Sequence, residues 1–238
     1  MSQRRLMPDF SSLEFPEDAF PPARAVENDY VRTCARGARR MAQLRVAVTG
    51  LARNLGHVLP ATIRRVERLC GMFADARVVV YENDSTDDTK RLLEAWARTD
   101  RRVHVVLDDC HDPKNPPTRC LARAERMARY RHRCQDLVLE RCAGFDAVVI
   151  LDLDVAGGFS LDGVANSFGH DHWDFIGSNG LIYRRDGRHV NTLRQYDTWA
   201  LRVDADLSPI PTAVAGGYVF LKIHEVLEHT PPAVHEAK

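Results

Sequence analysis

The sequence contains no apolar stretch that approaches the roughly 18 residues of a transmembrane helix. It also has no net charge, because 33 basic residues balance 33 acidic ones. Without a strong field of either sign, nothing in the composition favours a nucleic acid or an anionic membrane as the partner. The N-terminal residues lack the apolar core of a signal peptide, so we expect a cytoplasmic protein with no transmembrane segment.

The chain also has no internal repeat, no low-complexity segment and no Cys-x-x-Cys pair. Its six cysteines fall mostly where a predicted helix needs a small buried residue, so we interpret them as reduced thiols. At 238 residues and 45% hydrophobic content, one domain with a substantial core is expected.

Four prolines within the first 22 residues favour an extended arm at the start of the chain. With a short basic helix after it, this arm would form residues 1–43, ahead of a single larger domain at residues 44–238. The arginines of that helix are expected to be solvated, and they are Arg32, Arg36, Arg39 and Arg40.

Apolar, β-branched runs alternate with amphipathic segments over residues 44–107. Strands are predicted at residues 44–48, 77–81 and 103–107, and the first is expected to break at Thr49-Gly50. One helix is predicted after Pro60, and Ser85 or Thr86 can cap a second one. This alternation predicts an α/β fold, in which helices flank a mostly parallel sheet.

A further strand, residues 147–151, is expected to be buried on both faces, and it ends in Asp152 and Asp154. Because side chains two apart on a strand point to one side, the two carboxylates can converge where the chain leaves the sheet. Such oxygen ligands suit Mg²⁺ or Mn²⁺, and with the cation the phosphates of a nucleotide. The alternative is that Asp152 caps a turn and that Asp154 is solvated.

A long helix is predicted from about Thr118 to Cys142, with arginines on one side and an apolar face on the other. Arg131 projects into the middle of that apolar face, where a charge is costly without a partner. It either meets the phosphates of a nucleotide or forms a buried pair with an acidic residue. The residues expected on the apolar face are Cys120, Ala124, Met127, Ala128, Cys134, Val138 and Cys142.

Four segments carry a family resemblance: TGLARNLGHVL (49–59), YENDSTDDT (81–89), LDLDV (151–155), and WDFIGSNG (173–180) paired with YDTWALR (196–202). In this order they resemble glycosyltransferases of the GT-A fold, and in particular the fungal capsule-associated α-1,3-mannosyltransferases and their bacterial relatives. The resemblance covers roughly residues 44–223. It implies metal-dependent transfer of a mannose-like hexose from a GDP- or UDP-sugar to a glycan or other hydroxyl acceptor, with retention of configuration.

The resemblance also implies roles for single residues. Asp152 and Asp154 form the family's Asp-x-Asp motif and would bind Mn²⁺ or Mg²⁺. Residues that would hold the nucleotide are Thr49, Ala52, Arg53, Glu82, Asn83, Arg126, Arg131 and Asp152. Residues that would line the sugar and acceptor cleft as catalytic groups are Asp174, Asn179 and Asp197.

The family carries a Cys-Glu-His element after a Gly-Gly strand, and its histidine belongs to the metal site. Here Gly216-Gly217 is followed by Glu228-His229 and by His235, without that cysteine. The resemblance therefore implies His229 as a metal ligand, and it predicts a shortened or degenerate C-terminal end.

Two other functions stay open at this point. A sugar-1-phosphate nucleotidyltransferase has a similar sheet and also uses metal-binding carboxylates, although residues 49–54 are a poor version of its Gly-rich loop. A non-catalytic sugar-nucleotide binding domain would fit the missing C-terminal element.

Overall fold

The computed structural model describes residues 15–22, 24–114, 121–178, 181–186 and 189–195. They belong to two compact units, one within residues 8–170 and the other from residue 171 onward. The larger unit contains a parallel sheet, and the smaller one contains an antiparallel hairpin of β5 (Leu181–Asp186) and β6 (His189–Gln195). The predicted division into residues 1–43 and 44–238 stays a prediction.

The sheet of the larger unit has four strands in the order β3-β2-β1-β4, and every pair is parallel. Its strands are β1 (Arg45–Ala52), β2 (Asp75–Asn83), β3 (Val103–Asp108) and β4 (Ala147–Ile150). The valines and alanines of β1 and β2 are all buried, as expected for strands covered on both faces.

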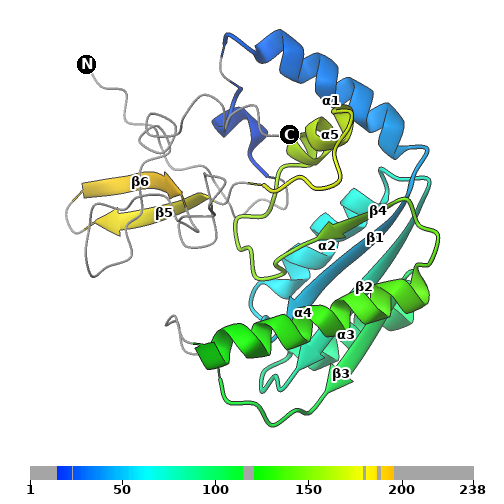
Figure 1. The fold of residues 1–238 in the computed structure, drawn as a ribbon. Coiled ribbons are helices and arrows are strands. Elements are labelled where there is room, and N and C mark those ends of the chain that lie inside the picture. Colours follow the sequence, from blue (N-terminus) through cyan, green and yellow to red (C-terminus); the bar gives the residue numbers. More distant parts are fainter. Residues whose placement is uncertain (1–14, 23, 115–120, 179–180, 187–188, 196–238) are drawn as a thin grey trace. The chain divides into compact units, whose positions relative to one another are not determined.

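Helices cover both faces of this sheet, with α4 across one face and α2 and α3 behind the other (Figure 1). They are α2 (Leu59–Cys70), α3 (Thr89–Thr99) and α4 (Leu121–Arg141). The predicted α/β class, a parallel sheet flanked by helices, is therefore confirmed. None of the described helices is both long enough and apolar enough to cross a membrane.

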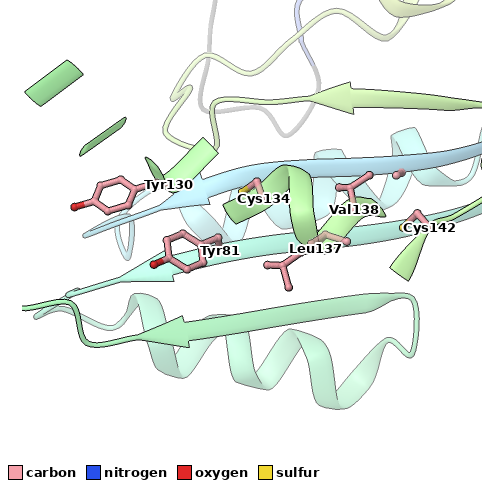
Figure 2. Close-up of a cluster of buried hydrophobic side chains, with 8 residues drawn as sticks. Tyr81, Tyr130, Cys134, Leu137, Val138 and Cys142 are labelled. Atoms are coloured by element: carbon pink, nitrogen blue, oxygen red, sulfur yellow. The ribbon is translucent and has the colours of Figure 1, made fainter. Parts of the chain in front are cut away.

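A cluster of buried side chains joins α4 to the middle of the sheet (Figure 2). Tyr130, Cys134 and Leu137 of α4 pack on Ala47 of β1 and Val79 of β2. Figure 2 also places Tyr81 and Tyr130 near the arrowhead ends of the strands, and their ring centroids lie 6.0 Å apart. One end of this core therefore reaches the carboxyl edge of the sheet.

The face by which α4 packs differs in part from the predicted one. Cys134, Val138 and the following Cys142 are buried as expected, but Ala124 and Ala128 are exposed. The buried face turns instead through Tyr130 and Leu137, because the amphipathic Tyr130 packs its ring inward and keeps its hydroxyl at the edge.

The ends of two strands also differ from prediction. β1 does not break at Thr49-Gly50 but continues to Ala52, since pairing with β2 extends through Ala52 and Glu82. β4 is not buried on both faces: Val148 is 50% exposed and Ile150 is 68% exposed. β4 is the terminal strand of the described sheet, so it has a neighbour on one side there and a half-buried surface.

A helix before the sheet, α1 (Glu27–Met41), packs against α5 (Leu161–Gly169), which follows the sheet. Two arginines that were predicted to be solvated form hydrogen bonds between these helices. Arg36 donates to the carbonyl of Gly169, and Arg40 donates to those of Phe168 and His170. They satisfy carbonyl groups at the C-terminal end of α5, where a positive charge is also favoured by the helix dipole.

The described cysteines are free thiols, as predicted. Cys70, Cys134 and Cys142 are buried, Cys34 is half-buried and Cys110 is exposed, while Cys120 lies outside the described residues.

Candidate functional site

The strand order places a topological switch point between β1 and β4. From β1 the chain adds β2 and then β3 on one side, and it then returns through α4 to add β4 on the other side of β1. Open α/β sheets bind ligands outside the carboxyl ends of the strands at such a reversal. The loops that follow β1 and β4 therefore form the candidate site, and we call this region the switch-point edge.

The loop after β4, residues 151–158, brings two carboxylates to the switch-point edge. Asp152 and Asp154 are exposed and flank Leu153, which is buried. Desolvation raises the pKa of the Asp154 carboxyl, the negative charge of Asp152 raises it further, and His57 opposes this shift. The two carboxylates are thus close enough to repel each other, which is the charge arrangement that a divalent cation relieves.

Arg131 is not in the middle of the apolar face of α4, and it forms no buried ion pair. Its side chain is 60% exposed, and its Nη2 lies 3.8 Å from Oδ1 of Asp152. Both outcomes follow from its place one residue after Tyr130, which takes the buried position. Arg126 lies half-buried earlier on the same helix.

Four of the residues predicted to hold a nucleotide are buried in the ends of β1 and β2. Thr49, Ala52, Glu82 and Asn83 are each less than 5% exposed. Thr49 Oγ1 donates to the carbonyl of Val79 at 2.9 Å, so its hydroxyl is used within the sheet. Their predicted roles toward a ligand are not tested by these positions.

Two polar atoms at this edge have no hydrogen-bond partner among the described residues: Nε of Arg53 and Oε2 of Glu82. The terminal nitrogens of Arg53 donate to the carbonyls of Asp112 (2.7 Å) and Pro113 (3.2 Å). Oε1 of Glu82 accepts from the amide of Ser85 at 2.7 Å. In each side chain one part of the charged group is thus anchored, while another atom of the same group has unused hydrogen-bonding capacity, which is costly for a buried atom.

The acidic loop after β2, residues 84–88, is held by its own hydrogen bonds. Asp87 Oδ1 accepts from the amide and hydroxyl of Thr89 at 3.0 and 2.5 Å, and its Oδ2 accepts from the amide of Gly56 at 2.8 Å. Desolvation raises the pKa of Asp87, but these hydrogen bonds outweigh it and the pKa is lowered. Asp87 therefore acts as a structural acceptor between this loop and the loop after β1.

The start of α3 differs from the prediction, since neither Ser85 nor Thr86 caps it. The helix begins at Thr89, and Asp87 accepts from the Thr89 amide. Ser85 Oγ instead accepts from the amide of Asn54 at 2.8 Å, and Asn54 Oδ1 accepts from the amide of Thr86 at 2.9 Å. The predicted cap is therefore wrong, and both residues hydrogen-bond instead to Asn54 of the neighbouring loop.

A group of possible metal ligands was missed by sequence reasoning. One ligand atom each from Asp84, Cys110 and Asp112 lies within 4.8 Å of the others. Asp84 accepts from the amides of His111 (2.8 Å) and Asp112 (3.2 Å), and Asp112 accepts from the hydroxyl of Tyr130 (2.7 Å). These carboxylates already fold the loop after β3 over the ends of β1 and β2. The available signal was that Asp84 and residues 108–112 end neighbouring parallel strands.

The roles of the remaining predicted residues stay predictions. Asp174 is exposed and belongs to the smaller unit. The others, Asn179, Asp197 and His229, lie outside the described residues.

No protein-family model and no curated protein matches this sequence. Among solved structures, the chain is similar to the mannosyltransferase PcManGT from Pyrobaculum calidifontis, determined in complex with GDP-Man and Mn²⁺. The TM-score is 0.35 and the identity 17%, over 61% of this chain and 41% of that one. A likeness of this size carries no argument about activity, so the functional conclusion depends on the geometry of the switch-point edge.

Proposed function

We propose that the chain is a metal-dependent glycosyltransferase that uses a nucleoside-diphosphate hexose, a GDP- or UDP-sugar, as donor. The observation that supports this most is the pair of Asp152 and Asp154 at the topological switch point, with the pKa of Asp154 raised by desolvation and by its neighbour. A hydroxyl group of a glycan or smaller molecule would be the acceptor, and retention of configuration is the expected stereochemistry.

Asp152 and Asp154 fit a divalent metal because they offer exposed oxygen ligands and a local excess of negative charge. Mn²⁺ or Mg²⁺ held there would offset the charge that develops on the diphosphate as the sugar leaves. Asp154 is the better candidate for direct contact, since desolvation and the charge of Asp152 both disfavour its ionised form when no cation is bound. His229 would add a further ligand.

The cationic group suited to the diphosphate is Arg131. Its guanidinium lies 3.8 Å from Asp152 and is 60% exposed, so it can reach an anion beside the aspartates without leaving α4. Arg126 would support it from the same helix. The base and ribose would lie toward the loops after β1 and β2, where Arg53 and Glu82 have unused hydrogen-bonding atoms. Asp174, Asn179 and Asp197 would contact the sugar and the acceptor.

The decisive experiment measures donor binding with and without metal. Calorimetric titration of GDP-mannose and of UDP-glucose, in Mn²⁺ and in EDTA, should give binding to one of them that depends on the cation. Asp154→Asn should lower the affinity measured in Mn²⁺ by about 100-fold, which is about 2.8 kcal/mol. Asp75→Asn is the matched control, because Asp75 is an exposed aspartate at the opposite, amino end of β2.

Unchanged metal-dependent affinity in Asp154→Asn would refute the assignment of the metal site. Two product assays separate the other functions. If the chain releases pyrophosphate from a nucleoside triphosphate when a sugar 1-phosphate is added, it is a nucleotidyltransferase. Binding of a donor with neither hydrolysis nor transfer would indicate a non-catalytic binding domain.

A further inference from the structure

The loop that carries the two aspartates is attached to α2, a helix that offers no group to the proposed ligand. Thr62 Oγ1 donates to the carbonyl of Leu153 at 3.0 Å. One turn later on the same helix, Nη1 of Arg65 donates to the carbonyl of Ala156 at 3.2 Å. Thr62 is 6% exposed and Arg65 is 5% exposed; the bond from Thr62 is buried, and the bond from Arg65 to the exposed Ala156 is partly buried.

The first of these bonds fixes the residue between the aspartates. Leu153 has its side chain buried, and its carbonyl is held by Thr62. With Leu153 fixed on the inner side of the loop, Asp152 and Asp154 are both left on the outer side. Without the bond to Thr62, the peptide after Leu153 could rotate, and Asp154 would then move relative to Asp152.

The second bond fixes the far end of the same loop. Gly158 has a φ of +77°, and its amide donates to the carbonyl of Val155 to close a turn. A Cβ atom at Gly158 would lie 2.6 Å from Nε of Arg65, so the turn is packed directly on the guanidinium. A guanidinium is costly to bury, and here part of that cost is offset because the carbonyl of Ala156 accepts a hydrogen bond from it.

We infer that Thr62 and Arg65 are positioning residues that hold residues 151–158 in the conformation that brings Asp152 and Asp154 together. This inference rests on the proposed function, because it concerns how the same two aspartates are presented to a cation. Neither side chain would touch the metal. Partners of this kind, which orient ligands without binding the ion, typically change metal affinity by about 10-fold to 100-fold when they are removed.

The first experiment replaces the Thr62 hydroxyl without changing the shape of the side chain. Thr62→Val should weaken Mn²⁺ binding by about 10-fold. The binding is measured from the electron paramagnetic resonance signal of free Mn²⁺. Thr62→Ser keeps the donor and should bind nearly as the wild type does. Thr99→Val is the control, because the Thr99 hydroxyl bonds to carbonyls of its own helix at the end of α3.

The second experiment tests the contact between Arg65 and Gly158 from both sides. Arg65→Met removes the donor to Ala156, and Gly158→Ala adds a Cβ where φ is positive and the guanidinium is in the way. Each should weaken Mn²⁺ binding by about 10-fold. Because part of the Gly158→Ala defect is the clash with Arg65, the double variant should lose less than the product of the two single losses.

Hydrogen exchange of the metal-free protein reports the attachment of the loop directly. In Thr62→Val and Arg65→Met, the amides of residues 151–158 should exchange faster, while those in the middle of β1 and β2 stay unchanged. Unchanged exchange in both variants would overturn the inference. Faster exchange with wild-type Mn²⁺ affinity would overturn it too, since the loop would then be held for stability alone.

These results are distinguishable from a failure of the proposed function. If Asp154→Asn abolishes Mn²⁺ binding while Thr62→Val and Arg65→Met bind normally, the metal site stands and the positioning role does not. If the wild-type chain binds no Mn²⁺ at all, the proposed function fails, and hydrogen exchange alone then decides whether α2 holds the loop.

Discussion

Two loops at the same edge of the sheet carry closely spaced aspartates, but their carboxyl groups differ in hydrogen bonding and in the direction of their pKa shifts. In the acidic loop after β2, Asp87 accepts three hydrogen bonds and its pKa is lowered despite desolvation. In the loop after β4, desolvation and the neighbouring Asp152 raise the pKa of Asp154. The first loop has its charges satisfied by the protein, and the second presents charges that conflict.

The difference shows which aspartates are available for a ligand. A carboxylate that accepts several backbone and side-chain donors stabilises the fold and has little to gain from a cation. A carboxylate whose ionised form is disfavoured is stabilised by a bound cation. Without the cation, its unfavourable charge lowers the stability of the folded chain. Substitutions in either loop test this difference.

The largest effect on the free energy of unfolding is expected at Thr89, which bonds to the acidic loop after β2. Its side chain is fully buried, donates to Asp87 and accepts from the amide of Leu55 at 2.6 Å. Thr89→Val leaves that buried amide without a partner, so the free energy of unfolding in urea should fall by about 2–3 kcal/mol. Thr99→Val should change it by less than about 0.5 kcal/mol. Equal losses in the two variants would mean that the network around Asp87 adds nothing.

The next effect is smaller: the same Asp→Asn substitution should change stability in opposite directions in the two loops. Asp87→Asn removes an ionised acceptor at the start of α3 and should lower the free energy of unfolding by about 1 kcal/mol. Asp154→Asn removes a charge that the fold disfavours, so the metal-free variant should melt above the wild type at pH 7. Mn²⁺ at a concentration that saturates the wild type should reverse that order, because the wild type binds the ion more tightly and gains more stability from it. Melting curves in EDTA and in Mn²⁺ test both statements.

The pH dependence of these differences should also have opposite signs. The pKa of Asp154 is raised above its ordinary 3.8, so the folded chain holds more protons between the two values and loses stability as the pH rises through them. The pKa of Asp87 is lowered below 3.8, so its contribution is complete above that value and is lost only as the pH falls further. From pH 7 to pH 4, the Asp154→Asn difference should shrink while the Asp87→Asn difference stays constant.

The smallest effect on stability is expected at Arg131, although it lies beside Asp152. An exposed pair at 3.8 Å contributes little, so Arg131→Met should change the free energy of unfolding by less than about 1 kcal/mol. Its effect on the affinity for a nucleoside diphosphate, measured by calorimetry, should be larger. Arg133→Met, at an exposed arginine of the same helix, serves as the control. A large loss of stability with unchanged nucleotide affinity would contradict the role proposed for Arg131.

The fold class was predictable because its signals are local. Short β-branched runs alternate with amphipathic helices, and this pattern specifies parallel strands with crossover helices. The end of β1 was not predictable in the same way, because Gly50 is a poor strand residue and only pairing with β2 carries the strand on to Ala52. The exposure of β4 was also missed, since an apolar run does not say how many neighbours a strand has.

Within the candidate site, the sequence identified groups but not their partners. The two aspartates after the strand and Arg131 were marked from residue type and spacing, and the structure places Arg131 3.8 Å from Asp152. The roles of Asp87, Thr62 and Arg65 were missed because each depends on a backbone group about 30 or 90 residues away. Nothing in a single sequence relates such positions.

The arginines that join α1 to the end of α5 have a consequence for how the chain folds. Their hydrogen bonds connect residues that are 128 to 133 positions apart. On a ribosome that adds about 5–20 residues per second, α5 is synthesised on the order of ten seconds after α1. During that interval the packing surface of α1 around Gly37 and Met41 is open to other chains, while β1 to β3 can already pair. Helix α1 is therefore expected to be among the last parts of the larger unit to become protected.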